Sequence, residues 1–190
     1  MTKLLFNNYG LFWKRSCVHW HGTKGNPGNL LGRIATSKKT SPVNFRDQRG
    51  VYFLYDSSFK LVYVGQAGSG SNRLHARLKN HHLEGFADRW EYFSWFGTRR
   101  VNKNGSLSVA KQSSHPTIAT VLDQLEGMVI ETAQTPLNRQ GGKLAKAEQY
   151  VQYIDTENLW INQREILDHI HEDVFEVKDM LKKLQGKPKD

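Results

Sequence analysis

A mirrored pair of tripeptides constrains this chain more than any other feature: Gly50-Val51-Tyr52 reads backwards as Tyr63-Val64-Gly65. Each tripeptide lies in a run of alternating apolar residues, 50–55 and 60–65, which predicts two β-strands. The residues between the runs, 56–59, form a loop of hairpin length that begins with good turn formers. The sequence therefore predicts an antiparallel β-hairpin.

Folding this hairpin symmetrically about its loop sets the expected register, in which Tyr52 faces Tyr63 and Gly50 faces Gly65. Because successive side chains point to opposite faces of a strand, the two tyrosines share one face. An ordinary aromatic cross-strand pair would explain them alone. The two glycines, however, leave a gap beside the phenols where a bulky group could dock. The opposite face is apolar and suited to a core, and it consists of Val51, Phe53, Val62 and Val64.

Positive charge gathers at the start of the chain. Residues 1–46 contain eight Lys or Arg and no Asp or Glu, while the whole chain has a formal net charge of +9. Such a segment predicts contact with a polyanion, and nucleic acid is favoured over a merely solvated surface. The basic residues expected to contact DNA are Lys14, Arg15, Lys24, Arg33, Lys38 and Lys39.

The expected location of the protein follows from what the sequence lacks. No apolar run reaches the roughly 18 residues of a membrane span, and the start has no signal-peptide pattern. The single cysteine, Cys17, excludes an internal disulfide and suits a reducing compartment. We therefore expect a cytoplasmic protein that does not act on membranes.

The residues after the hairpin predict two helices and a third strand. A helix is expected from about residue 72 to 81, an aromatic-rich strand over 90–97, and a tight turn at Asn104-Gly105 within 101–109. A second helix is expected over 116–133, ended by Pro136. Its apolar residues recur at helical spacing and predict a buried stripe of Ile118, Leu122, Leu125 and Val129.

Charged and polar residues on these helices form a second group. Arg73, Arg77 and His81 follow at intervals of four and therefore share one helix face, close behind the tyrosine hairpin. A guanidinium offers fixed donors that match phosphate oxygens. Glu126 is the carboxylate at the edge of the expected stripe, and Asn138 follows the second helix. Each residue alone has an ordinary structural explanation, but their coincidence with the tyrosine pair predicts a site.

Taken in order, these residues resemble the GIY-YIG nuclease superfamily. Gly50-Val51-Tyr52 stands at the first motif, with Val in place of Ile, and Tyr63-Val64-Gly65 stands at the second. Arg77 matches the catalytic arginine, and His81 the frequent histidine one turn later. The resemblance covers roughly residues 50–140.

The second half of the motif set is similar to the family as well. Glu126 matches the metal-binding glutamate, and Pro136-Leu137-Asn138 resembles the closing Pro and Asn. The position after the second motif, lysine in some members, is Gln66 here, so a role for lysine does not carry over.

The resemblance implies an α+β fold with a small three-stranded antiparallel sheet flanked by helices. In this division residues 1–46 are a basic, aromatic N-terminal extension that contacts DNA, and residues 47–142 are the catalytic domain. Residues 143–190 form a C-terminal helical segment.

The resemblance also assigns roles in phosphodiester hydrolysis. Tyr52 would direct or deprotonate water, with Arg77 and a divalent ion favouring its phenolate. Arg77 would stabilise the pentacovalent phosphate, and Glu126 would hold a single Mg²⁺ (or Mn²⁺) at the leaving oxygen. The remaining site residues would support this chemistry or let the DNA strand approach, and they are Tyr63, His81, Asn138, Gly50, Gly65 and Arg73.

The last segment carries an apolar seam at heptad spacing. It is shorter than the roughly three to four heptads that indicate a coiled coil strongly. Docking onto the chain's own domain is therefore favoured over self-association, which would make a homodimer. The seam consists of Leu167, Ile170, Val174, Val177, Leu181 and Leu184.

Taken together, these sequence features predict a Mg²⁺-dependent DNA endonuclease. Extensions on both sides of a small catalytic core favour a restriction or host-defence nuclease. A DNA repair or mobile-element endonuclease is the alternative within that class. A non-catalytic nucleic-acid-binding module that uses the basic extension is the alternative from another class.

Overall fold

The computed structural model of the protein describes residues 4–21, 28–36, 41–68, 72–83, 87–109, 116–133, 144 and 147–156, together with positions 174, 175, 177, 178, 180 and 181. The chain forms two compact units, Met1–Ile154 and Asp155–Asp190. The described residues of the second unit after Asp155 are helical, and Val174, Val177 and Leu181 of the predicted seam are exposed there. The other seam residues, Leu167, Ile170 and Leu184, lie outside the described residues.

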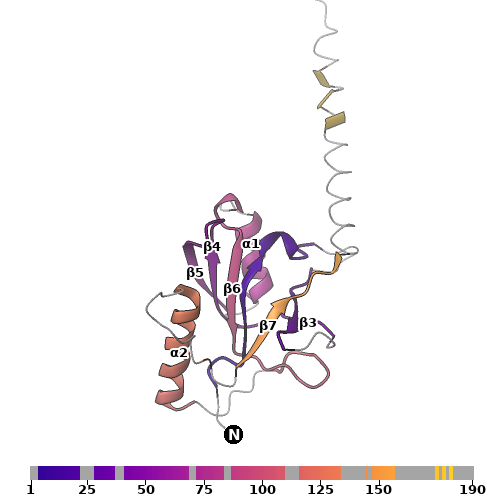
Figure 1. Ribbon diagram of the computed structural model, residues 1–190. Helices are drawn as coiled ribbons and strands as arrows, with labels where there is room; N and C mark the ends of the chain where they lie inside the picture. The colour runs from indigo at the N-terminus through magenta and orange to yellow at the C-terminus, as the bar shows by residue number, and fades with distance from the viewer. Residues whose placement is uncertain are drawn as a thin grey trace, which may run out of the picture. The chain divides into compact units, whose positions relative to one another are not determined.

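One mixed sheet forms the first unit (Figure 1), and seven strands belong to it among the residues described. Its strand order is β3-β2-β7-β1-β6-β4-β5. β1 and β7 are parallel, and the other neighbouring strands are antiparallel. The strands are β1 (Asn8–Lys14), β2 (Leu31–Ile34), β3 (Val43–Asn44), β4 (Gly50–Tyr55), β5 (Leu61–Ala67), β6 (Tyr92–Gly97) and β7 (Glu148–Gln152).

The described part of the first unit has two α-helices, α1 (Leu74–Leu83) and α2 (Ile118–Ala133), and short 3-10 turns at Arg15–Cys17 and Ala87–Arg89. None of its helices is long and apolar enough to cross a membrane. The predicted turn at Asn104-Gly105 is confirmed, because the flanking residues Val101 and Leu107 form a β-bridge and Gly105 has a φ of 79°.

The expected small three-stranded antiparallel sheet flanked by helices is wrong. The three predicted strands do form and are neighbours, as β5, β4 and β6, but the sheet continues beyond β6 into four further strands, of which β1 is the first. A sheet that stopped at β6 would leave a row of unpaired N–H and C=O groups at that edge. Residues from the start of the chain pair there instead, with Asn8 opposite Gly97 and Lys14 opposite Tyr92.

Trp13 explains why β1 lies inside the sheet. Its side chain is only 1% exposed, and its ring meets Trp95 edge-on with the ring centroids 5.3 Å apart. The indole Nε1–H donates to the Tyr150 carbonyl oxygen of β7 at 3.1 Å. Burial of an aromatic side chain with its polar atom satisfied strongly favours the folded state. The aromatic residues at the start of the chain thus belong to the core.

α1 and α2 cover opposite faces of the strands β4 and β6 (Figure 1). Tyr52 and Leu54 of β4 share a core with Leu78 of α1. Phe53, which points the other way, shares a second core with Met128 of α2. Because successive side chains of β4 alternate between the two faces, Tyr52 lies on the face that α1 covers and Phe53 on the face that α2 covers.

The predicted buried stripe of α2 is wrong, because Ile118, Leu122, Leu125 and Val129 are between 37% and 80% exposed. α2 instead buries Gln124, Gly127, Met128 and Thr132. The Gln124 amide accounts for this rotation, since its Oε1 accepts from Phe6 N at 3.0 Å and its Nε2 donates to Phe6 O at 2.8 Å. A buried amide with satisfied hydrogen bonds decides which face packs where apolar spacing alone does not.

Candidate functional site

The register of the β4–β5 hairpin differs from the predicted one by two residues. Tyr52 pairs with Gly65, and Tyr63 pairs with Leu54. One residue of the shift comes from the loop, which extends to Lys60 because Asp56 N donates to Lys60 O at 3.0 Å. The other comes from a bulge next to Tyr55, which pairs with Leu61. A shift of two preserves the alternation of faces, so Tyr52 and Tyr63 still share one face, as diagonal neighbours.

The two tyrosines and His81 form a compact aromatic group on that face. The Tyr52 and Tyr63 rings are stacked with centroids 6.1 Å apart, and the Tyr63 and His81 centroids are 4.6 Å apart. Tyr52 Oη and His81 Nε2 share a hydrogen bond of 2.9 Å. Tyr52 is fully buried, whereas Tyr63 is 40% exposed. Solvent therefore reaches this group through Tyr63.

Arg77 completes the group and supplies its positive charge. Its guanidinium lies close enough to Tyr52 and Tyr63 for both phenols to act on it. The neighbouring Tyr52 raises the pKa of Arg77, so the guanidinium is charged at every working pH. Its Nε–H is buried and has no acceptor among the described residues. Arg77 thus presents an unused donor beside a half-exposed phenol.

Burial disfavours the phenolate form of Tyr52 in the metal-free protein. It raises the pKa of Tyr52 to about 12, although the neighbouring Arg77 guanidinium acts in the opposite direction. Desolvation of the charged form outweighs the neighbouring guanidinium. At neutral pH Tyr52 can lose its proton only as a partner accepts it, and His81 is in position to do so.

The gap expected at Gly50 and Gly65 is filled. A Cβ atom at Gly65 would collide with the phenol ring of Tyr52, which lies directly over this glycine. Gly50 has a φ of 151°, and a Cβ atom there would collide with the carbonyl oxygen of Phe96 on β6. Both glycines therefore permit close packing within the sheet.

Glu126 lies away from this group. It is an exposed residue of α2, which packs on the sheet face opposite to Tyr52. A protein Mg²⁺ site can consist of one or two carboxylates and several waters. The position of Glu126 therefore decides whether an ion that it binds could lie beside Tyr52 and Arg77. The described residues also contain no group of three or more His, Cys, Asp or Glu side chains that could hold a metal ion. This arrangement does not fit a metal bound by Glu126 beside Tyr52 and Arg77.

The predicted DNA contacts of the N-terminal segment lie in several places. Lys14 forms an ion pair with Glu91 at 3.4 Å, and the Arg15 guanidinium lies over the Trp90 ring at 5.3 Å. The Arg33 guanidinium lies over the Tyr153 ring at 4.6 Å. The other predicted contacts, Lys24, Lys38 and Lys39, lie outside the described residues, as does Asn138.

Two arginines next to the site were missed by sequence reasoning. Arg49 immediately precedes β4, and Arg99 lies two residues after the end of β6. β4 and β6 are antiparallel, so the start of one strand meets the end of the other. The run Arg99-Arg100 after the predicted strand and Arg49 before the hairpin were the signals that could have found this pair.

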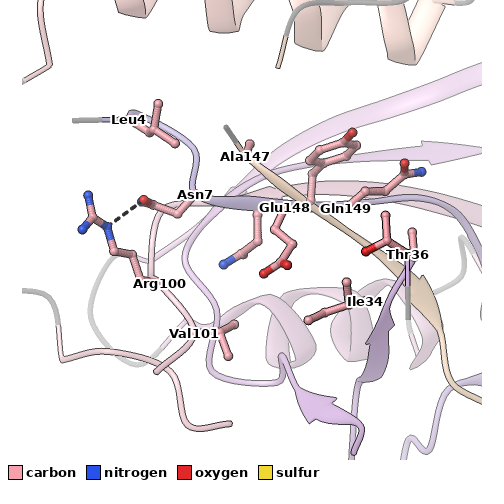
Figure 2. A pocket seen from close by; sticks show the side chains of 12 residues that line it. Leu4, Asn7, Ile34, Thr36, Arg100, Val101, Ala147, Glu148 and Gln149 are labelled. Atoms are coloured by element: carbon pink, nitrogen blue, oxygen red, sulfur yellow. Dashed lines mark hydrogen bonds between the residues drawn. The ribbon is translucent and has the colours of Figure 1, made fainter. Parts of the chain in front are cut away.

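A separate cavity of about 830 Å³ opens where β1 and β7 begin and β2 ends (Figure 2). Arg100 and Glu148 line it, and the Arg100 Nε–H donates to Asn7 Oδ1 at 2.9 Å. Among the described lining residues there is no member of the Tyr52, Tyr63, Arg77 and His81 group. The cavity is therefore distinct from that group.

Burial of His75 on α1 makes the fold sensitive to acid. His75 is 4% exposed, and its Nε2–H donates to His19 O at 2.9 Å. Burial lowers the pKa of His75 from 6.5 to about 4. The neutral ring therefore stabilises the fold above pH 6.5, and this contribution of about 3 kcal/mol is lost as the pH falls through 6.5 to 4.

Urea unfolding at pH 7 and at pH 4 measures this effect. A His75→Gln variant should lose less stability between the two pH values than the wild-type protein does. Equal losses in the two proteins would show that another group causes the acid sensitivity.

No protein-family model matches the chain, and comparisons with curated proteins and with solved structures also give no match.

Proposed function

We propose that the protein is an endonuclease that hydrolyses phosphodiester bonds of DNA at the group formed by Tyr52, Tyr63, Arg77 and His81. One observation carries the proposal: a charged guanidinium with an unused N–H lies against two phenols, one of which shares a hydrogen bond with a histidine. A phosphate oxygen is a natural acceptor for that N–H. The Tyr–His pair supplies a path for a proton.

In this proposal Tyr63 and Arg77 meet the phosphate first, because Tyr63 is exposed and Arg77 is partly exposed, whereas Tyr52 is buried. The guanidinium donates to the non-bridging oxygens and offsets the charge that develops as water adds to phosphorus. Tyr63 stacks against Tyr52, so displacement of Tyr63 by the substrate admits the attacking water to the buried phenol.

Proton transfer then follows the Tyr52–His81 hydrogen bond. The Tyr52 oxygen takes a proton from the attacking water as the Tyr52 proton passes to His81 Nε2. The new P–O bond forms, the bond to the leaving oxygen breaks, and that oxygen takes a proton from solvent. No step is assigned to a metal ion, because Glu126 lies on the helix that covers the other face.

Cleavage of a supercoiled plasmid tests the proposal. The wild-type protein should nick or cut the plasmid, and Tyr52→Phe should lower the rate about 100-fold, because the phenylalanine cannot accept the proton of water. Urea unfolding of both proteins checks that the variant is folded. Absence of cleavage by the wild-type protein under all metal conditions, or a wild-type rate in Tyr52→Phe, would overturn the proposed chemistry.

The metal requirement is a separate arm of the same assay. Parallel reactions with Mg²⁺, with Mn²⁺ and with EDTA measure it, and Glu126→Gln tests the predicted ligand. A loss in EDTA together with an equal loss in Glu126→Gln would support Glu126 as a metal ligand and require α2 to move. Full activity in EDTA would agree with the proposed steps, none of which uses a metal ion.

A non-catalytic nucleic-acid-binding module is the second candidate. The full burial of Tyr52 and the position of Glu126 on the other face favour it. The plasmid assay separates the two candidates, because a binding module would shift the plasmid in a gel without changing its form.

Within the nuclease class we propose a restriction or host-defence role in the cytoplasm, with DNA repair or mobile-element cleavage as the alternative. The basic segment at residues 1–46 and the single cysteine support DNA as partner and a reducing compartment. Sequencing the ends of cleaved DNA tests the role, because a restriction enzyme cuts at one recurring sequence and a repair enzyme cuts at damage.

A further inference from the structure

Three arginines meet at the end of the sheet where β4 begins and where β5 and β6 end. This arginine cluster consists of Arg49, Arg73 and Arg99. Arg49 packs over Gly68, the residue that follows β5, and the Arg73 Nη1–H donates to Gly68 O at 3.4 Å. Arg99 lies close enough to both arginines for their charges to lower its pKa, after the larger effect of its own burial.

Hydrogen bonds between side chains and the backbone hold the cluster together. The buried Gln48 side chain accepts from both Arg49 N and Arg99 N through its Oε1, at 2.8 and 2.9 Å. The Arg99 guanidinium donates to the carbonyl oxygens of Asp47 and Ser108 at 2.9 and 2.6 Å. The two strand ends are thereby fixed, and like charges stay together whether or not an anion is bound.

Two members of the cluster, Arg49 and Arg99, form no ion pair with an acidic side chain in the described part of the chain. Asp47 attracts Arg99 electrostatically, but its carboxylate is paired with Arg46 at 3.7 Å. The Nε–H of Arg49 is also buried without an acceptor among the described residues. Neighbouring like charges and an unsatisfied donor both cost free energy that a bound anion would offset.

The cluster is continuous with the proposed catalytic group. Arg73 immediately precedes α1, and Arg77 N donates to Arg73 O at 3.0 Å, which places the two residues about 6 Å apart along the helix axis. Arg77 contacts Tyr52 at one end of this row, and Arg73 contacts Gly68 beside Arg49 at the other. Guanidinium groups in a row suit successive phosphates of one strand.

We propose that the arginine cluster binds a backbone phosphate of the DNA strand that is cut, next to the scissile phosphate at Arg77. This inference rests on the proposed function for the identity of the strand. The contact is with phosphate oxygens, so it sets the position and direction of the strand and carries no base specificity.

Fluorescence anisotropy with a labelled DNA duplex tests the cluster. Binding is measured in EDTA and in a Tyr52→Phe background, so that the duplex stays intact. Arg49→Gln should raise Kd about tenfold, because it removes a charge-assisted contact. It should also make the slope of log K against log salt concentration shallower by about 0.9. Arg49→Lys, which keeps the charge, should retain most of the salt slope.

The matched control is Lys103→Gln, which removes one positive charge from an exposed residue of the 101–109 turn. It should leave Kd within twofold of the parent. An unchanged Kd and salt slope in folded Arg49→Gln, or an equal loss in the Lys103 control, would overturn the cluster as a phosphate site.

The two proposals fail separately. If the parent protein binds DNA through the cluster but the wild-type protein does not cleave a plasmid, the phosphate site stands and the nuclease is wrong. If the wild-type protein cleaves and folded Arg49→Gln binds and cleaves as well as its parent, the nuclease stands and the cluster is wrong.

Discussion

Replacing Arg77 by alanine should lower the rate of plasmid cleavage about 1,000-fold. Among the described residues, Arg77 is the charged group whose electrostatic effect reaches both Tyr52 and Tyr63. Removal of a donor aimed at developing negative charge costs a factor of about 100 to 1,000 in rate. Arg77→Lys should recover only part of the loss, because an ammonium keeps the charge but not the fork of donors.

Single-turnover cleavage of a labelled duplex, with protein in excess, measures the Arg77 effect on the chemical step. Lys103→Ala is the control for loss of one positive charge, and its rate should stay near that of the wild-type protein. A rate within tenfold of wild type for folded Arg77→Ala would exclude the proposed role of the guanidinium.

Replacing Trp13 by alanine should lower the free energy of unfolding by about 4 kcal/mol. Truncation of a buried tryptophan leaves a cavity among the rings of β1, β6 and β7 and costs about 3 to 5 kcal/mol. The loss of the hydrogen bond from Nε1 to Tyr150 O adds an unsatisfied buried acceptor. A reduction of this size leaves many single domains partly unfolded.

Urea denaturation followed by far-UV circular dichroism measures this loss. Trp13→Phe should cost less, because it refills most of the cavity. Val109→Ala, at a residue that is 85% exposed, should change the unfolding free energy by less than about 0.5 kcal/mol. If Trp13→Ala unfolds within 1 kcal/mol of the wild-type protein, β1 is not part of the core of the sheet.

Local structure was predictable from the sequence where pattern and turn chemistry agree. The strand at 50–55, the strand ending at 97 and the helix ending at 133 all form where the alternation and the helical spacing place them. The hairpin register was not predictable from symmetry, because a longer loop and a bulge at Tyr55 each add one residue. The wider sheet was missed because its pairing is nonlocal, as between Asn8 and Glu148.

The candidate site was predictable in part for the same reason. Tyr52, Tyr63, Arg77 and His81 come together because they lie on adjacent elements joined by short connections. The position of Glu126 depends on which face of α2 packs, and that is decided by Gln124, whose partner Phe6 is 118 residues away in the sequence. No local spacing contains that information.

The parallel pairing of β1 with β7 sets the order in which a growing chain can fold. β1 is synthesised first, yet one of its two neighbouring strands ends at Gln152. On the ribosome the hairpin β4–β5 and its neighbour β6 can form early, because their contacts are close in sequence. One side of β1 must stay unpaired until residues 148–152 leave the exit tunnel. Chains that stop before that point therefore expose an unpaired apolar strand, and we expect them to aggregate or to be degraded.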